Sequence, residues 1–300
     1  MNILTASVVA LALVGRPNAP PARRAEPLVS AEWLKAHLKD PDLVVLHVGP
    51  AEDYMKAHVP GARFVSLRDL HAGNGHSESE LALEMLPADS LRRVLEGIGI
   101  GDDSRVVVYF AQEWVSPSTR VLFTLDWAGL GDRASLLDGG IEAWKGVGGA
   151  TTDVVPEAKR AHLSALRTRP TVVDAAWVNA HRKANGVRVV DARARAFYDG
   201  VDGHERRRGH VAGAGSVPFT EIVDDRNFVL SRDRLAKLFR DAGVAPGDTV
   251  VAYCHIGQQA TLTLLGARVL GHPVRLYDGS FQDWSMRDLP VEIASPAGRK

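Results

Sequence analysis

The chain has 300 residues, of which 45% are hydrophobic, and 36 basic side chains balance 36 acidic ones. This length is typical of about two domains of ordinary size, and the apolar fraction suffices for a sizeable core. A net charge of zero gives no global field to hold a polyanion, so neither nucleic acid nor a membrane is expected as a partner. The single cysteine excludes an intrachain disulfide, a cysteine-rich zinc site and a CxxC redox pair.

Residues 1–27 are expected to lie outside the folded domains. Ile3 to Val14 are apolar apart from Thr5 and Ser7, and a proline-rich run follows. This stretch is too short to span a bilayer, which needs about 20 residues, but it suits the apolar core of a secretory signal. We therefore expect a signal or a disordered segment here and a periplasmic or secreted protein; a cytoplasmic location is the alternative.

Residues 28–150 alternate amphipathic segments with short apolar runs bounded by turn residues, a pattern typical of helices and of strands buried on both faces. The expected elements are a helix over Ala31–Leu38, strands over Leu43–Val48 and Gly61–Ser66, a helix around Leu91–Leu95, a strand over Arg105–Phe110, a helix over Ser118–Ala128 and a strand over Ala134–Leu137. Residues 151–170 are polar without strong periodicity and are expected to form a linker.

Residues 171–292 show the same order of elements. They are a helix over Ala175–Lys183, strands over Val187–Ala192 and Gly213–Pro218, a helix over Leu235–Ala242, a strand over Thr249–Cys254, a helix over Ala260–Leu270 and a strand over Val274–Tyr277. Strands that alternate with helices predict an α/β fold in each half, with a mainly parallel sheet flanked by helices on both faces.

The two halves are also related in sequence. Five blocks recur in the same order at offsets of 140 to 152 residues: Val29–Leu34 with Val173–Val178, Leu43–Val48 with Val187–Ala192, His58–Ala62 with His210–Ala214, Val106–Phe110 with Val250–Cys254, and Leu136–Trp144 with Leu276–Trp284. Blocks that recur in order indicate a duplicated domain with loop insertions.

Chemistry is expected where a central strand of the second copy ends and a helix begins. The only thiol of the protein, Cys254, opens a short loop there, followed by the helix-forming run from Ala260. The free N–H groups and the dipole at a helix start favour an anion, so they stabilise a thiolate. Gly257 lets the loop fold tightly, with its N–H groups pointing inward.

A lone cysteine after an apolar strand is also common as a small buried packing residue. The first copy, however, has Phe110 at the equivalent position, and its loop Ala111–Ser116 contains neither cysteine nor glycine. Two junctions that served packing alone would not differ so much in loop chemistry. The comparison therefore favours a reactive Cys254.

Taken together, these residues resemble the rhodanese family, specifically the tandem-domain thiosulfate sulfurtransferases. The resemblance covers about Leu28 to Pro290 and rests in the second copy on Asp191-Ala-Arg193, Arg208-Gly-His210-Val-Ala-Gly213-Ala, the loop opened by Cys254, and Tyr277-Asp278-Gly279-Ser-Phe-Gln-Asp-Trp284. It implies that Cys254 accepts a sulfane sulfur, holds it as a persulfide and passes it to cyanide or a thiol. It also implies a non-catalytic first domain, and no cofactor is required.

The donor is expected to be thiosulfate, a dianion that needs a thiolate together with cationic or N–H stabilisation of its sulfonate end. The residues expected to bind it are His255, Ile256, Gly257, Gln258, Gln259, Arg193 and Arg195. Two departures from the family leave the substrate open. The loop carries His255 and Ile256 where thiosulfate-using relatives have basic residues, and a substrate arginine of the family falls on Phe197. Arg193 is equally compatible with a structural ion pair.

Three alternative functions remain: a 3-mercaptopyruvate sulfurtransferase, a rhodanese-like binding or sulfur-carrier module without activity, and a cysteine-loop phosphatase. The phosphatase would require an arginine at the position of Ala260. His71 and His76 lie in a Gly-, Asn- and Ser-containing stretch without a matching set of carboxylates or thiols, so no metal site is expected. We expect a monomer whose partners are the small-molecule donor and acceptor.

Overall fold

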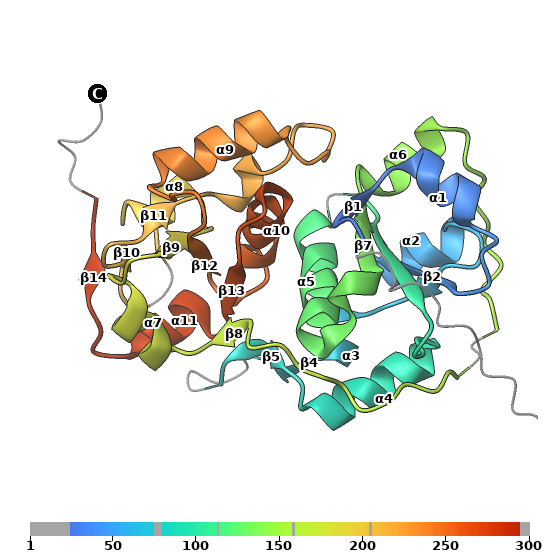
Figure 1. Ribbon diagram of the computed structural model, residues 1–300, viewed down its shortest axis with the longest axis horizontal. Coiled ribbons are helices and arrows are strands. Elements are labelled where there is room, and N and C mark those ends of the chain that lie inside the picture. Colours follow the sequence, from blue (N-terminus) through green and yellow to red (C-terminus); the bar gives the residue numbers. More distant parts are fainter. Residues whose placement is uncertain (1–24, 75–79, 113, 158–159, 204–205, 295–300) are drawn as a thin grey trace, which may run out of the picture.

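The computed structural model describes residues 25–74, 80–112, 114–157, 160–203 and 206–294, which form two α/β halves side by side (Figure 1). The segment expected to be a signal falls almost wholly outside these residues. Among the described residues, no helix is both long and apolar enough to cross a membrane.

The first half is built on a five-stranded sheet in the order β1-β7-β6-β2-β3, in which every pair of neighbouring strands is parallel. Its elements are β1 (Leu28–Val29), α1 (Ala31–His37), β2 (Leu43–Val48), α2 (Ala51–Lys56), β3 (Arg63–Phe64), α3 (Leu67–Leu70), β4 (His71–Asn74), β5 (Ala82–Met85), α4 (Ala88–Ile98), β6 (Arg105–Phe110), α5 (Val115–Leu125), a π-helical turn at Asp126–Leu130, a 3-10 turn at Gly131–Arg133, β7 (Ala134–Leu137) and α6 (Gly140–Gly146).

The second half repeats this order as β8-β13-β12-β9-β11, again with parallel neighbours. Its elements are β8 (Val172–Val173), α7 (Ala175–His181), β9 (Val187–Asp191), α8 (Arg195–Tyr198), β10 (His210–Val211), β11 (Gly215–Ser216), a 3-10 turn at Phe219–Glu221, α9 (Arg232–Asp241), β12 (Thr249–Tyr253), α10 (Ala260–Leu270), β13 (Val274–Tyr277), α11 (Ser280–Met286) and β14 (Val291–Glu292). The predicted fold class and the duplication are confirmed.

Helices cover both faces of each sheet. In the first half, Leu34 of α1 and Trp144 of α6 join the core on one face, and Leu91 of α4 lies in the core on the other. The second half places α7 and α11 on one face and α9 and α10 on the other. Helices α5 and α10 pack against each other between the two sheets (Figure 1). One hydrophobic core therefore runs through both halves, which fixes one relative to the other.

The segment between the halves, residues 151–170, has no helix or extended strand in its described part, and it packs on the first half. Leu163 is 2% exposed and lies in the shared core. Arg169 pairs with Asp126 of the π-helical turn at 2.9 Å. The linker is therefore anchored by both apolar and ionic contacts.

The hairpin of β4 and β5 was not among the expected elements. Its strands pair antiparallel, with His71 opposite Met85. It leaves the first half and reaches the second, where the backbone N–H of Ala82 donates to the Gln282 side chain at 3.2 Å. In Figure 1, β5 lies next to β8. A segment of the first half thus reaches the edge of the second sheet.

Candidate active site

Cys254 directly follows β12, which lies in the sheet between β9 and β13. All strands of this sheet are parallel, so Cys254 is at the carboxyl end of the sheet, where α/β proteins bind ligands. Residues 254–259 form the loop that leads into α10, and the Cys254 side chain is fully buried. The N-terminal end of the 11-residue helix α10 adds a positive dipole close to the thiol.

The carbonyl groups of this loop are bound on its outside. Phe281 N–H donates to the Cys254 carbonyl at 2.9 Å, and Gln282 N–H to the His255 carbonyl at 3.0 Å. The Gln258 carbonyl accepts from both the N–H and the hydroxyl of Thr261, at 3.1 and 2.7 Å. Because a trans peptide directs its C=O and N–H to opposite sides, carbonyl groups held in this way favour N–H groups that face an anion on Cys254. This is the arrangement expected for a cradle that stabilises a thiolate or persulfide.

Gly257 adopts a left-handed backbone conformation, with φ of +82°. A Cβ at this position would lie 2.8 Å from the Asp278 carbonyl oxygen and 3.2 Å from Nη1 of Arg120. Glycine is therefore required here twice, for its φ and for its lack of a side chain. The prediction that Gly257 permits a tight loop agrees with this geometry.

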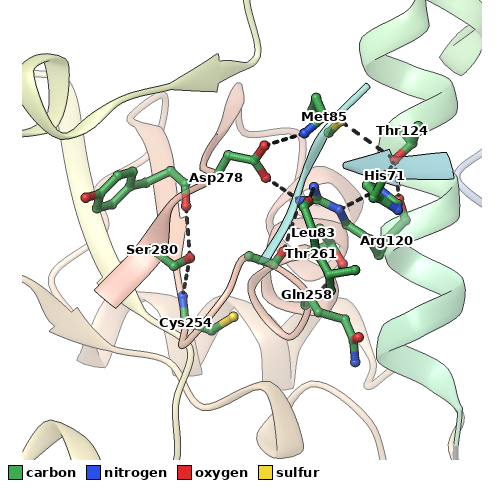
Figure 2. A network of polar contacts seen from close by, with 12 residues as sticks. His71, Leu83, Met85, Arg120, Thr124, Cys254, Gln258, Thr261, Asp278 and Ser280 are labelled. Carbon is green, nitrogen blue, oxygen red and sulfur yellow. Dashed lines mark hydrogen bonds and ion pairs between the residues drawn. The ribbon is translucent and has the colours of Figure 1, made fainter. Parts of the chain in front are cut away.

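Ser280 holds the first residue of the loop by a hydrogen bond to its backbone. The Cys254 N–H donates to Ser280 Oγ at 3.1 Å, and the Ser280 hydroxyl donates to the Tyr277 carbonyl at 2.9 Å (Figure 2). Ser280 itself is fully buried and has a positive φ of 52°. This contact fixes the backbone of Cys254 to the turn between β13 and α11.

The remaining loop residues are only partly buried. His255 packs edge-on against Phe197, with ring centroids 4.6 Å apart. The Gln258 amide donates to Ser116 Oγ of the first half at 3.3 Å. Among the described residues, Oε1 of Gln259 is buried and has no hydrogen-bond partner. The expected substrate contacts of His255, Ile256, Gln258 and Gln259 stay predictions.

The two arginines expected near the substrate differ in their surroundings. Arg193 is 1% exposed, forms a bidentate pair with Asp191 at 2.7 to 3.2 Å, and donates to the Gly209 carbonyl at 2.6 Å. Of its two alternatives, this geometry supports the structural ion pair and gives no support to substrate contact. Arg195 is exposed and pairs with Glu221 at 3.0 Å, so its role in binding stays a prediction.

The first half has a matching polar network without a nucleophile. Tyr109 and Tyr253 both accept from a backbone N–H, that of Val59 and Val211, at 3.1 and 3.0 Å. The tyrosine hydroxyl also forms a hydrogen bond with His47 in the first half and with Asp191 in the second. Burial lowers the pKa of His47 to about 4, so it is neutral where the second half has a charge. The framework is duplicated, but its charge is not.

Sequence reasoning missed the contribution of the first half to this site. Arg120 on α5 is fully buried, pairs with Asp278 at 2.7 Å and donates to the Gly257 carbonyl of the Cys254 loop at 3.3 Å. The backbone N–H of Met85, on β5, donates to the other carboxylate oxygen of Asp278 at 3.0 Å. One signal was available: Arg120 is the lone charged residue in the segment that forms α5. A single charge in a buried helix requires a specific partner.

No group of three or more potential metal ligands comes together in the part of the chain that the structure describes. His71 lies 3.0 Å from the Leu67 carbonyl and 2.9 Å from the Thr124 hydroxyl. His76 lies outside the described residues.

Comparison with known proteins identifies the family. The Rhodanese-like domain family matches residues 30–146 and 174–287. The chain belongs to this family. The resemblance inferred from the sequence is thereby confirmed, and each matched segment contains four of the five strands of one sheet.

Relatives that cover most of the chain are sulfurtransferases. The chain is 29% identical over 280 residues to the 3-mercaptopyruvate sulfurtransferase of Escherichia coli. The alignment covers 88% of this chain and 97% of the relative. The chain is 30% identical over 286 residues to the thiosulfate sulfurtransferase of Corynebacterium glutamicum, covering 89% and 90%. The crystal structure of SseA from Escherichia coli superposes with a TM-score of 0.72 and 27% identity, over 85% of this chain and 99% of SseA.

Proposed function

We propose that this rhodanese-family protein is a sulfurtransferase that carries a sulfane sulfur as a persulfide on Cys254. The observation that carries this proposal is the position of the single thiol, in a loop whose carbonyl groups are bound on the outside, at the start of α10. The sulfurtransferase relatives support the same activity. No separate base is required, because the reacting form of the thiol is its anion.

The reaction has two displacements. The Cys254 thiolate attacks the outer sulfur of thiosulfate, the S–S bond of the donor breaks, and sulfite leaves with the bonding electrons. A thiophilic acceptor such as cyanide then attacks the terminal sulfur of the persulfide. Thiocyanate leaves and the thiolate is restored, so the loop must stabilise an anion on sulfur in every resting state.

Cys254→Ser tests the mechanism. The hydroxyl replaces the thiol at nearly constant volume, so the variant should fold but show no sulfur transfer and no persulfide mass shift. Wild-type protein incubated with thiosulfate should gain the mass of one sulfur atom, and cyanide should remove it. Substantial turnover by the serine variant would disprove the assignment. A wild-type protein that forms the persulfide but never turns over would instead be a sulfur carrier.

The donor is a separate question, and we propose thiosulfate. 3-Mercaptopyruvate is the second candidate, because the Escherichia coli relative is named for it. The two donors are distinguished by kcat/KM measured side by side with the same acceptor. A preference for 3-mercaptopyruvate would overturn the proposed donor while leaving the persulfide mechanism in place.

His255 bears on this choice because it occupies the loop position directly after the nucleophile. His255→Arg supplies a permanent charge for the sulfonate, and one partly exposed charge-assisted contact contributes about 1 kcal/mol. We expect kcat/KM for thiosulfate to rise about fivefold in this variant, which is the same energy expressed as a rate ratio. An unchanged kcat/KM would exclude this side chain from the anion site.

A further inference from the structure

Arg120 contacts the Cys254 loop although it belongs to the first half of the chain. Its guanidinium reaches across from α5 to contact four other segments (Figure 2). It pairs with Asp278 at 2.7 Å, and it donates to the Gly257 carbonyl at 3.3 Å, to the Leu83 carbonyl and to Nε2 of His71 at 2.9 Å. Residues from both halves thus converge on one side chain.

These contacts hold the guanidinium in a single position. A buried arginine is costly unless its charge is paired and its N–H groups are bonded, and here each nitrogen has an acceptor. Burial, together with the charge of Arg120, lowers the pKa of His71 to about 3, so its ring is neutral. With the proton on Nδ1, the ring donates to the Leu67 carbonyl at 3.0 Å, which leaves Nε2 to accept from Arg120.

The contact with Gly257 determines how the loop backbone faces. A trans peptide directs its C=O and N–H to opposite sides. Because the Gly257 carbonyl points to Arg120, the N–H of Gln258 points away from Arg120. Rotation of this peptide would reverse the two groups and present a carbonyl dipole in place of an N–H. The other loop carbonyls described above are held by second-half residues, whereas this one is held from the first half.

We propose that Arg120 is a positioning residue for sulfur transfer. It does not touch the donor; it fixes the Gly257–Gln258 peptide so that the loop presents N–H groups to the sulfur anion on Cys254. This role rests on the proposed function of Cys254 as the nucleophile. It also explains how the half without a nucleophile contributes to catalysis.

The test replaces the whole ion pair, because Arg120→Met alone would leave Asp278 buried and unpaired. The double variant Arg120→Met/Asp278→Asn removes both charges and keeps an oxygen for the Met85 N–H. A matched control is Arg268→Met/Asp126→Asn. Arg268 and Asp126 form another arginine–aspartate pair between the halves, at 3.6 Å. Arg268 lies in the last turn of α10, at the end of the helix away from the loop.

The first readout is the pH at which the Cys254 thiolate forms. It is monitored by the ultraviolet absorbance of the thiolate, with Cys254→Ser as the blank. Since the chain has one cysteine, the signal belongs to the nucleophile. We expect the midpoint to move to higher pH in the Arg120 double variant and to stay in place in the control. We also expect kcat/KM to fall about tenfold or more, given that deleting one anion-stabilising donor typically costs 10²–10³ in rate. In the control it should change less than twofold.

Arg120→Lys provides a second test that keeps the buried charge beside Asp278. A single ammonium cannot reproduce the planar fork that contacts Gly257, Leu83, His71 and Asp278 together. It should therefore fold with the ion pair retained and still show the shifted thiolate midpoint. This variant decides the matter if the double variant does not fold.

Folded variants with the wild-type midpoint and wild-type kcat/KM would overturn the proposal. The thiolate measurement needs no turnover, so it remains informative even if the protein proves not to transfer sulfur. If the variants show the expected shift of the thiolate midpoint but the wild type transfers no sulfur, the result counts against the proposed function and not against the positioning role.

Discussion

Glu84, on the hairpin that reaches the second half, should make the stability of the protein depend on pH. Burial and the nearby carboxylates of Asp278 and Asp283 raise its pKa from the ordinary 4.5 to about 7, although Arg120 opposes the shift. Its Oε1 is buried and lacks a hydrogen-bond partner among the described residues. The carboxyl group therefore binds a proton more tightly in the folded than in the unfolded protein.

A raised pKa in the folded state means that the stabilising contribution is complete below pH 4.5 and is lost as pH rises to about 7. A shift of this size corresponds to about 3 kcal/mol if it is fully expressed. Glu84 lines an open pocket with Tyr277 and Arg287, and solvent screening reduces the expected effect to about 1–2 kcal/mol. Glu84→Gln, which cannot ionise, should escape this loss.

The assay is urea unfolding of wild type and Glu84→Gln at intervals from pH 4.5 to 8.5. The difference in unfolding free energy should grow from near zero at the acid end to about 1–2 kcal/mol in favour of the variant above pH 8. Glu142→Gln, at an exposed position on α6, serves as the control, and as a surface substitution it should differ from wild type by less than about 0.5 kcal/mol. A Glu84→Gln profile parallel to that of wild type would refute the reasoning.

Three further predictions concern the loop, the first half and the linker. Gly257→Ala should lower kcat/KM at least tenfold, because the added Cβ would collide with the Asp278 carbonyl. The control Gly213→Ala has a similar φ of +84° and no atom within 4 Å of the added Cβ, so it should lower stability by about 1–2 kcal/mol and leave activity intact. Equal losses of activity in the two variants would count against the contact with Asp278. Phe110→Cys/Cys254→Ser should form no persulfide that turns over, because the loop after Phe110 lacks a glycine and is one residue shorter than the loop after Cys254; cyanide-dependent release of sulfur from this variant would contradict it. Leu163→Ala should destabilise the protein by about 2–5 kcal/mol in urea unfolding, while Val154→Ala, at an exposed position of the same linker, should have little effect; equal effects would show that the linker is not part of the core.

The central strands and α10 were predictable because their sequences are unambiguous. Leu43–Val48, Arg105–Phe110, Ala134–Leu137 and Val274–Tyr277 are apolar runs bounded by turn residues, and each became a strand with those bounds. Such runs can be buried on both faces only in a parallel sheet covered by helices. These elements could therefore be predicted from local composition alone.

Two of the four edge strands lacked such a signal. β1 and β8 have two residues each, and they are strands because their backbones pair with β7 and β13. Two apolar residues occur in many loops, so the sequence pattern cannot identify a strand of this length. Helix α5 also began earlier than expected, because Pro117 in its first turn requires no N–H partner.

The nucleophile and its loop were predictable for another reason, which is that the duplication supplied an internal reference. Cys254 differs from Phe110 at a position where the surrounding strands agree, and that difference pointed to chemistry. The same comparison did not decide between a substrate role and a structural role for Arg193. Its ion pair with Asp191 replaces His47 and Gly49 of the first half, and either a substrate role or a structural role would have produced this difference.

The contribution of the first half was beyond sequence reasoning because it depends on contacts between residues far apart in the chain. Arg120 and Asp278 are 158 positions apart, and neither lies in a motif that indicates the other. Their meeting requires α5 to pack on α10 and the β4–β5 hairpin to dock on the second half. A duplicated domain that loses its nucleophile is free to change its own loop, but its buried interface remains constrained by packing and by paired charges. The first half therefore keeps its influence on the Cys254 loop through the contact of Arg120 with the Gly257 carbonyl.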